Sequence, residues 1–156
     1  MSWGWAVASS ELEQMLSDAA TEVLECMFFT SVIGDPEPGK YPPEQWILAR
    51  LSFRGNPAGR FGAGTPLETG RKITAAFLGG EEDTLTERQI GEVICELANM
   101  LCGSVLSSLA RETRFELSHP EIEPPGAVFP RDATACRTFR LEEGPLAVWL
   151  ELERAV

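Results

Sequence analysis

Apolar residues recur at helical spacing over about residues 85–109 and predict a long amphipathic helix there. The side expected to face the core carries Ile90, Ile94, Leu97, Ala98, Leu101 and Val105. The opposite side, here called the outer stripe, carries Glu92, Glu96, Asn99 and Gly103. Asn and Gly are poor residues for a helix interior, and Gly costs about 1 kcal/mol relative to Ala. Solubility alone does not explain this composition, so the outer stripe is a candidate interaction surface.

A second amphipathic helix is predicted from Glu11 to about Val32, with Ser9 or Ser10 as its cap. Its outward positions have the same spacing as the outer stripe and lie 74 residues earlier: Asp18, Glu22, Glu25 and Phe29. The apolar positions of the two helices correspond at the same offset. This correspondence predicts an internal duplication, although any two amphipathic helices can be aligned in phase.

Alternating apolar and polar residues predict two pairs of β-strands. Residues 46–53 and 59–64 would form the first pair, with residues 55–57 as the turn between them. Residues 136–141 and 146–153 would form the second pair. Each pair therefore has the organisation of a β-hairpin.

Shorter elements connect these units. A short helix is expected over residues 65–78, with Thr65 able to cap it. Thr84 and Glu87 have the spacing of a capping box, which predicts the start of the long helix. A brief strand is expected over residues 115–119, and a proline-rich connection follows it.

Together these elements predict an α+β fold in which two long helices pack on a mostly antiparallel sheet. Both helices would place their apolar faces on the sheet and leave their outward faces accessible to a partner. With 156 residues, of which 44% are hydrophobic and 24% charged, the chain fits a single domain over residues 1–156. Disorder is expected only at the ends, with residues 1–10 as the candidate segment.

Charge and hydropathy argue against several classes of partner. The net charge of −11 argues against nucleic-acid binding, because phosphate recognition needs a basic surface. The first residues lack the basic and apolar regions of a signal peptide, and no apolar run approaches the roughly 18 residues of a membrane span. We therefore expect a cytoplasmic location, with neither nucleic acid nor a membrane as partner.

Residues that bind metals or act as nucleophiles form no recognisable motif. None of the four cysteines forms a C-x-x-C pair. Cys95 and Cys102 lie ~10 Å apart along the predicted helix axis, so buried free thiols are the better interpretation. His119 is the single histidine and has no acid or nucleophile at an informative spacing. The glycines of residues 59–64 lack the phosphate-loop pattern and are better explained by turns and close packing. We expect no metal or cofactor of the protein's own.

The segment Glu96-Leu97-Ala98-Asn99 resembles the signature of the CheC/CheX/FliY family of chemotaxis phosphatases. Glu92 precedes Glu96 by four residues, and Gly103 follows Asn99 by four, as in that signature. The CheX branch is the most similar. The resemblance covers most of the chain: an initial helix, a hairpin, a short helix, the long helix, a proline-containing connection and a terminal strand pair.

The resemblance implies a phosphatase that hydrolyses the aspartyl phosphate of a CheY-type response regulator. Asn99 would orient the attacking water, and Glu96 would pair with a lysine of the receiver domain. Glu92 and Gly103 would support the docking surface. Phosphoryl transfer depends mainly on positioning and electrostatics, and an amide can hold a water although it cannot act as a base. Mg²⁺ and the phosphoaspartate would belong to the receiver.

The chain departs from the family pattern at several positions. The pattern favours Asp or Ser where Glu92 stands, and a proline where Ile122 stands. In the first helix, Glu25 and Phe29 replace the amide and the glycine. The first helix therefore resembles a degenerate, inactive copy, and one active surface is expected.

Two other roles are open from the sequence. A non-catalytic adaptor of a two-component or chemotaxis system could bind a receiver through the same surface, and it would tolerate loss of the Asn99 carboxamide. A homodimer could form if the strand over residues 146–153 paired at an edge, although its apolar residues are equally explained as core.

Overall fold

The computed structural model describes residues 9–36, 41–124, 126–127, 130 and 133–153. Their α-helices are α1 (Ser9–Met27), α2 (Leu67–Leu78) and α3 (Glu87–Leu109), and their short 3-10 helices are η1 (Pro43–Gln45) and η2 (Glu82–Thr84). Their strands are β1 (Val32–Gly34), β2 (Trp46–Arg54), β3 (Gly59–Pro66), β4 (Glu116–Leu117), β5 (Glu121–Ile122), β6 (Ala135–Leu141) and β7 (Gly144–Leu152).

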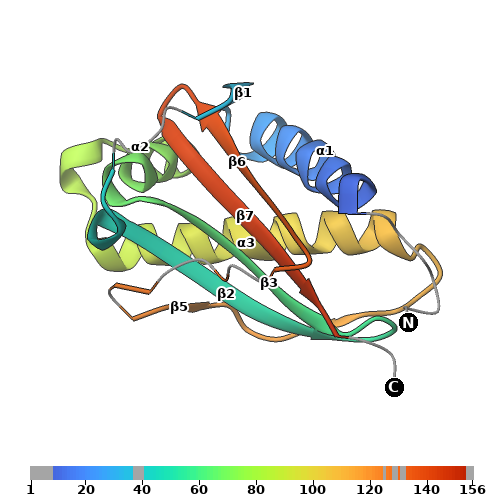
Figure 1. The fold of residues 1–156 in the computed structure, drawn as a ribbon. Helices are drawn as coiled ribbons and strands as arrows, with labels where there is room; N and C mark the ends of the chain where they lie inside the picture. The colour runs from blue at the N-terminus through green and yellow to red at the C-terminus, as the bar shows by residue number, and fades with distance from the viewer. Residues whose placement is uncertain (1–8, 37–40, 125, 128–129, 131–132, 154–156) are drawn as a thin grey trace.

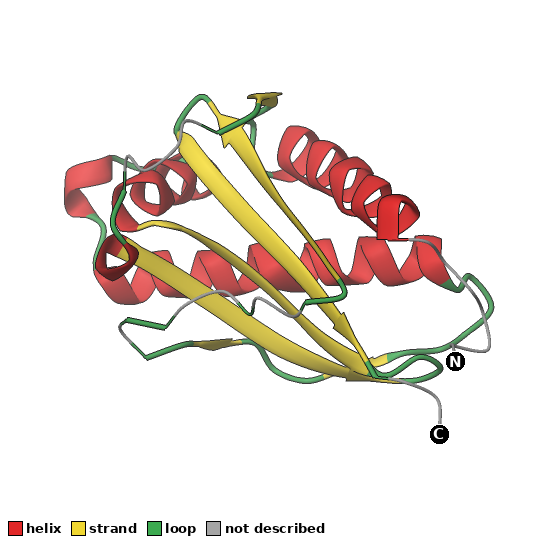
Figure 2. Ribbon diagram, viewed as in Figure 1, coloured by secondary structure: helices red, strands yellow, loops and turns green. Residues whose placement is uncertain are grey.

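The strands form one antiparallel sheet in the order β1-β6-β7-β3-β2-β4, and β5 also pairs with β2. The three helices cover one face of this sheet (Figures 1 and 2). The longest of them, α3, runs behind β2 and β3 and also packs against α1 and α2. The predicted α+β fold, with helices on an antiparallel sheet, is confirmed.

The sheet contains two units of the same topology. In one unit α1 is followed by β1, β2 and β3, and in the other α3 is followed by β4, β5, β6 and β7, where β5 has no counterpart in the first unit. The last strands, β3 and β7, pair at the centre of the sheet, with β2 and β6 on either side. Each short strand, β1 or β4, pairs with the outer strand of the other unit. The predicted duplication therefore extends from the helices to the topology of the sheet.

The inner side of α3 lies at the centre of the hydrophobic core. Its six predicted core residues are each at most 1% exposed: Ile90, Ile94, Leu97, Ala98, Leu101 and Val105. By length and composition α3 could also cross a membrane, but 56% of its apolar window is buried inside the fold. Burial in the core therefore accounts for the hydropathy of this helix.

The first helix ends earlier than predicted. It ends at Met27 because the chain turns at Phe29, whose φ is 56°. The backbone amides of Phe28 and Thr30 both donate to the Leu24 carbonyl, at 3.1 and 3.2 Å, and these bonds satisfy the end of the helix. The chain is then free to form β1, which the hydrophobic pattern did not predict.

Two expectations about helix starts also change. Ser9 and Ser10 are helical, whereas the sequence placed them in a disordered end; residues 1–8 lie outside the described residues. Thr65 does not cap α2, because its Oγ1 donates instead to the Pro145 carbonyl at 2.7 Å. That hydrogen bond ties the end of β3 to β7.

The predicted strand pairs are present, but the homodimer mode proposed for residues 146–153 is wrong. This segment lies in β7, which pairs with β6 on one side and β3 on the other, so it has no free edge. Within the predicted proline-rich connection, β5 pairs with β2. A strand of two residues is too short for alternation to reveal it.

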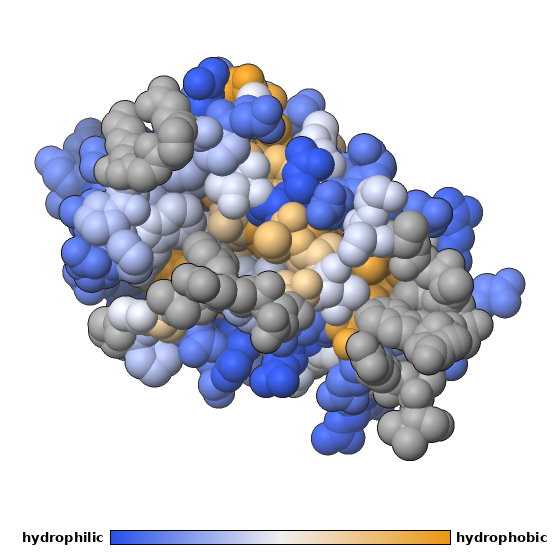
Figure 3. Space-filling model, viewed as in Figure 1, coloured by the Kyte–Doolittle hydropathy of each residue, from blue (hydrophilic) through white to orange (hydrophobic). Residues whose placement is uncertain are grey.

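The face of the sheet away from the helices shows small apolar patches between hydrophilic residues (Figure 3). Trp149 of β7 lies on this face and is only 3% exposed. Its indole covers Gly62 of β3, where a Cβ would lie 1.8 Å from Trp149 Cζ2. The predicted close-packing role of the glycines in this strand is confirmed at Gly62.

We expect Gly62→Ala to lower the free energy of unfolding by about 1–3 kcal/mol, because Trp149 must leave its position. The matched control is Gly80→Ala, since a Cβ at Gly80 meets no atom within 4 Å. Urea denaturation followed by circular dichroism measures both variants. Equal stabilities would contradict the close-packing role of Gly62.

Candidate functional site

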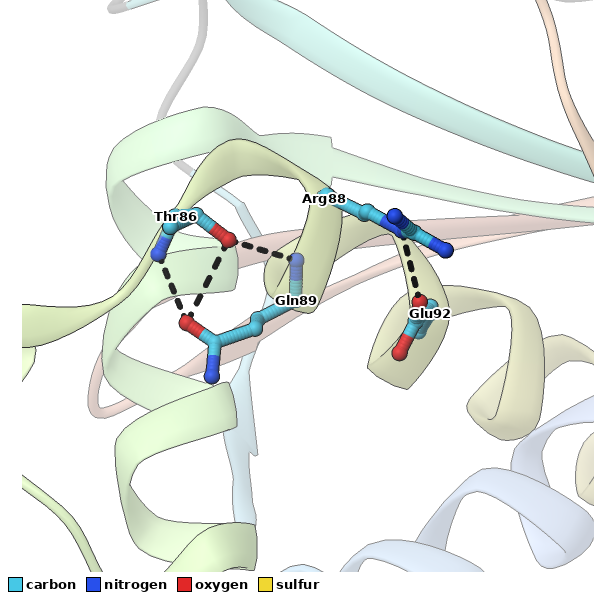
Figure 4. A network of polar contacts seen from close by, with 4 residues as sticks. All are labelled: Thr86, Arg88, Gln89 and Glu92. Carbon is cyan, nitrogen blue, oxygen red and sulfur yellow. Dashed lines mark hydrogen bonds and ion pairs between the residues drawn. The ribbon is translucent and has the colours of Figure 1, made fainter.

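A capping box fixes the first turn of α3. Thr86 Oγ1 accepts a hydrogen bond from the Gln89 backbone N–H at 3.2 Å, and the Thr86 N–H donates to Gln89 Oε1 at 2.8 Å (Figure 4). The sequence predicted a capping box at Thr84 and Glu87. The observed box begins two residues later, at Thr86. The helix start is correct to within this shift.

The burial of its inner side fixes the rotation of α3 about its axis. Leu97 and Ala98 are fully buried, so Glu96 and Asn99 on either side of them point away from the core. Glu96 is exposed and Asn99 is half-buried. Residues three apart in a helix share a face and are separated by about 4.5 Å along its axis. A carboxylate and a carboxamide are thus presented side by side on a rigid helix.

The polar side chains of this face differ in their partners. Glu92 forms an ion pair with Arg88, with 3.2 Å between Glu92 Oε1 and Arg88 Nε (Figure 4). Both side chains are exposed, so the pair contributes little stability. In the part of the chain that the structure describes, Glu96 forms no ion pair and the Asn99 carboxamide forms no hydrogen bond. Glu96 and Asn99 are therefore available to an external group.

The outer face of α3 is one wall of a groove of about 690 Å³. The α3 wall includes Gly91, Glu92, Cys95, Glu96 and Asn99, and the facing wall is formed by His119, Pro120 and Ile122. We call residues 119–122, which carry the facing wall, the strap. The strap contains β5 and follows the β2 edge of the sheet (Figure 1).

The structure brings three of the four predicted site residues into this groove. Gly103 is the exception, because it lies beyond Asn99 on the exposed side of α3 and does not line the groove. A Cβ at Gly103 would meet no atom within 4 Å, so packing does not require a glycine there.

Sequence reasoning missed the facing wall. It treated His119 as an isolated loop residue, whereas the structure places it in the groove with Glu96 and Asn99. The position of His119 depends on the pairing of β5 with β2, which no local pattern encodes. The one local signal is Ile122, an apolar residue between two glutamates.

The cysteines of α3 are not nucleophiles near neutral pH. Burial raises the pKa of the Cys95 thiol, and the negative charges of Glu121 and Glu92 raise it further. Burial also raises the pKa of Cys102 to about 12. Because the thiolate is the reactive form, these shifts disfavour reaction at both thiols. The predicted buried free thiol is confirmed for Cys102, and Cys95 is only half-buried.

The charged groups of the groove are mainly carboxylates. Glu87, Glu92 and Glu96 line it, and Arg88 lies among them. Over the described residues, no group of three His, Cys, Asp or Glu side chains could hold a metal ion. The groove therefore presents a largely negative surface.

The corresponding face of α1 differs chemically. Where α3 has Asn99, α1 has the exposed carboxylate of Glu25. The position that corresponds to Gly103 is Phe29, which lies in the turn just beyond the end of α1. The Phe29 side chain is 72% exposed and would obstruct the close approach of a partner. The two units thus share a scaffold but present different surfaces.

Solved structures of CheX proteins have the same fold as this chain. CheX from Desulfovibrio desulfuricans matches with a TM-score of 0.70 and 19% identity, covering 92% of this chain and 99% of that one. A chain of the CheX–CheY–BeF₃–Mg²⁺ complex from Borrelia burgdorferi matches with a TM-score of 0.70 and 18% identity, covering 90% and 97%. CheX from Vibrio vulnificus matches with a TM-score of 0.70 and 15% identity, covering 95% and 100%.

Sequence comparison identifies the family. No curated protein matches the sequence. Residues 47–128, however, match the profile described as chemotaxis phosphatase CheX, and these residues include the first hairpin, α3 and the strap. Because this match spans more than half of the chain and the fold agrees with solved CheX structures, the protein belongs to the CheX family of chemotaxis phosphatases.

Proposed function

We propose that this protein hydrolyses the aspartyl phosphate of a CheY-type receiver domain, with the outer face of α3 as its catalytic surface. The observation that carries the proposal is that, among the described residues, the Asn99 carboxamide and the Glu96 carboxylate lie beside each other on a rigid helix without a polar partner. The Borrelia burgdorferi complex, in which a CheX protein is bound to CheY, supports a receiver as the partner.

Asn99 would act by positioning water. In the hydrolysis a water oxygen bonds to phosphorus as the bond between phosphorus and the aspartyl oxygen breaks, which yields inorganic phosphate and a free carboxylate. The transition state is loose, so a strong base is not required. Asn99 Oδ1 would accept a hydrogen bond from the water and hold it in line for attack.

Glu96 would dock the receiver. Its carboxylate would pair with a receiver lysine and so fix the direction from which Asn99 enters the receiver's site. Glu92 is already paired with Arg88, which leaves Glu96 as the freer of the two carboxylates of the outer stripe. We assign Glu92 and Gly103 a supporting role in receiver binding.

Mg²⁺ would be held by the receiver, since the described residues of this chain include no cluster of metal ligands. The Borrelia burgdorferi complex contains BeF₃ and Mg²⁺ together with CheY, which supports this division. We propose that the reaction takes place in the cytoplasm. A homodimer is not required, because Glu96 and Asn99 lie on one helix of one chain.

We expect Asn99→Ala to lower kcat for phosphate release from a phosphorylated receiver by about 100-fold or more, because the attacking water loses its position. The matched control is Glu25→Ala, which changes the corresponding position of α1. Single-turnover phosphate release at saturating enzyme measures both variants. Unchanged release by Asn99→Ala would exclude the catalytic role and leave a receiver-binding adaptor.

Reversal of the charge at Glu96 should weaken docking. We expect Glu96→Lys to lower kcat/KM at least about tenfold, and reversal of the receiver lysine to Glu should restore part of the loss, because the ion pair is rebuilt with opposite polarity. Glu22→Lys, at the corresponding position of α1, is the control and should have no effect. If the loss of kcat/KM with both variants together equals the sum of the two single losses in free energy, a direct contact between Glu96 and the receiver lysine is contradicted.

Gly103→Ala separates a docking role from a folding role. The variant should stabilise α3 by about 0.5–1 kcal/mol, because Ala is the better helix former and the space around Gly103 is empty. It should at the same time raise KM for the phosphorylated receiver, since the added methyl group obstructs close approach. Thermal unfolding and phosphate release measure the two effects. An unchanged KM would remove Gly103 from the docking surface.

A further inference from the structure

The strap is held along β2 at both of its ends. Just before it, the Ser118 N–H donates to the Ser52 carbonyl at 2.8 Å. The Ser52 N–H in turn donates to Ser118 Oγ at 2.8 Å. Just after it, the Glu123 N–H donates to the Leu48 carbonyl, also at 2.8 Å. The strap therefore has little freedom to move relative to the sheet.

An ion pair strengthens the attachment at the second end. Glu123 Oε1 lies 2.7 Å from Arg50 Nε of β2, and the Glu123 side chain is largely buried. Because α3 is fixed by its buried face and the strap by β2, the two walls of the groove are held at a constant separation. Such a preformed groove binds a partner without first having to order itself.

Ile122 of the strap packs against α3 at Gly91. If Gly91 carried a Cβ, that atom would lie 3.3 Å from Ile122 Cγ1 and 3.7 Å from Ile122 Cδ1. The absence of a side chain at Gly91 thus allows Ile122 to lie directly against α3. Ile122 is nevertheless 40% exposed, so part of its apolar surface faces the groove and is not used by the fold.

The exposed part of Ile122 stands out on this surface. The exposed large hydrophobic side chains of the described residues are Met27, Phe29, Ile33, Leu78 and Ile122. Of these, Ile122 is the one that lines the groove with Glu96 and Asn99.

Charge alone is a poor source of affinity in this groove. A phosphorylated receiver would bring a negative phosphoryl group towards a wall that carries Glu87, Glu92 and Glu96, on a protein of net charge −11. One ion pair at Glu96 must act against this repulsion. Apolar contacts at the centre of an interface often supply most of the binding energy, and Ile122 and Pro120 are placed to make such contacts.

We propose that Ile122 is an affinity-determining contact for the receiver, an inference that rests on the proposed function. An apolar side chain beside the receiver's phosphorylation site packs against Ile122 and Pro120 as α3 brings Asn99 to the phosphoryl group. The strap thereby selects receivers that carry an apolar residue at that place. Asn99 determines the rate of hydrolysis, and Ile122 adds apolar affinity and selectivity to the docking charge of Glu96.

The test compares Ile122→Thr with Ile33→Thr. Both variants replace an isoleucine in a short edge strand by another β-branched residue, and Ile33 is similarly exposed, at 46%, on the opposite edge of the sheet. The probe is a CheY-type receiver loaded with beryllofluoride and Mg²⁺, and its Kd is measured by calorimetry. Phosphate release from the phosphorylated receiver gives kcat and KM for the same variants.

We expect Ile122→Thr to raise Kd and KM about tenfold with kcat unchanged, while Ile33→Thr binds as the parent protein does. Ile122→Leu, which keeps the apolar area, should bind nearly as tightly as the parent. Equal loss of affinity in the Leu and Thr variants would indicate a structural role and overturn the proposal.

The Ile122 and Asn99 variants distinguish loss of the strap contact from loss of catalysis. An unchanged Kd in Ile122→Thr, together with a loss of kcat in Asn99→Ala, would overturn the strap contact and leave the phosphatase function intact. A raised Kd in Ile122→Thr, together with an unaffected Asn99→Ala, would leave the strap as a docking contact of a non-catalytic adaptor.

Discussion

The burial of the inner side of α3 is the constraint on which the rest of the structure depends. This helix packs against α1, α2, β2 and β3, and its core residues are removed from water almost completely. Rotation of α3 by even one residue position would expose part of this surface and bury charged groups, at a large cost in free energy. The same packing that stabilises the fold therefore sets the direction of Glu96 and Asn99, although neither side chain takes part in it.

The duplicated topology shows that this burial constrains the inner faces of the helices and not their outer faces. The two units place α1 and α3 on the same face of the sheet and bury corresponding positions, such as Leu16 with Ile90 and Val23 with Leu97. Their outer faces differ, because the apolar core does not constrain the chemistry of the outward side chains. One unit presents an amide and a glycine there, and the other presents a carboxylate and the exposed ring of Phe29. A shared scaffold thus carries two chemically different surfaces.

The groove lies between two segments that are distant in sequence, α3 and the strap. Its α3 wall carries the polar groups, and its other wall is a strap positioned by hydrogen bonds to β2. The polar wall carries the carboxylates and the amide of α3, whereas the strap carries apolar surface that its hydrogen bonds to β2 hold in place. This division of roles is common at interfaces, where charged groups guide the approach and a small apolar centre provides affinity.

The sequence by itself determined the elements with strong local patterns. The 3.6-residue period of α3 located its buried and outer sides, and the alternation of β2, β3, β6 and β7 revealed the strand pairs, because these signals arise from residues close together in the chain. Only the tertiary structure decided which strand edges are free, where α1 ends and how β5 pairs with β2. It also brought His119 and Ile122 into the groove beside Asn99. These features depend on contacts between distant segments, and the hydrophobic period within one segment carries no information about such contacts.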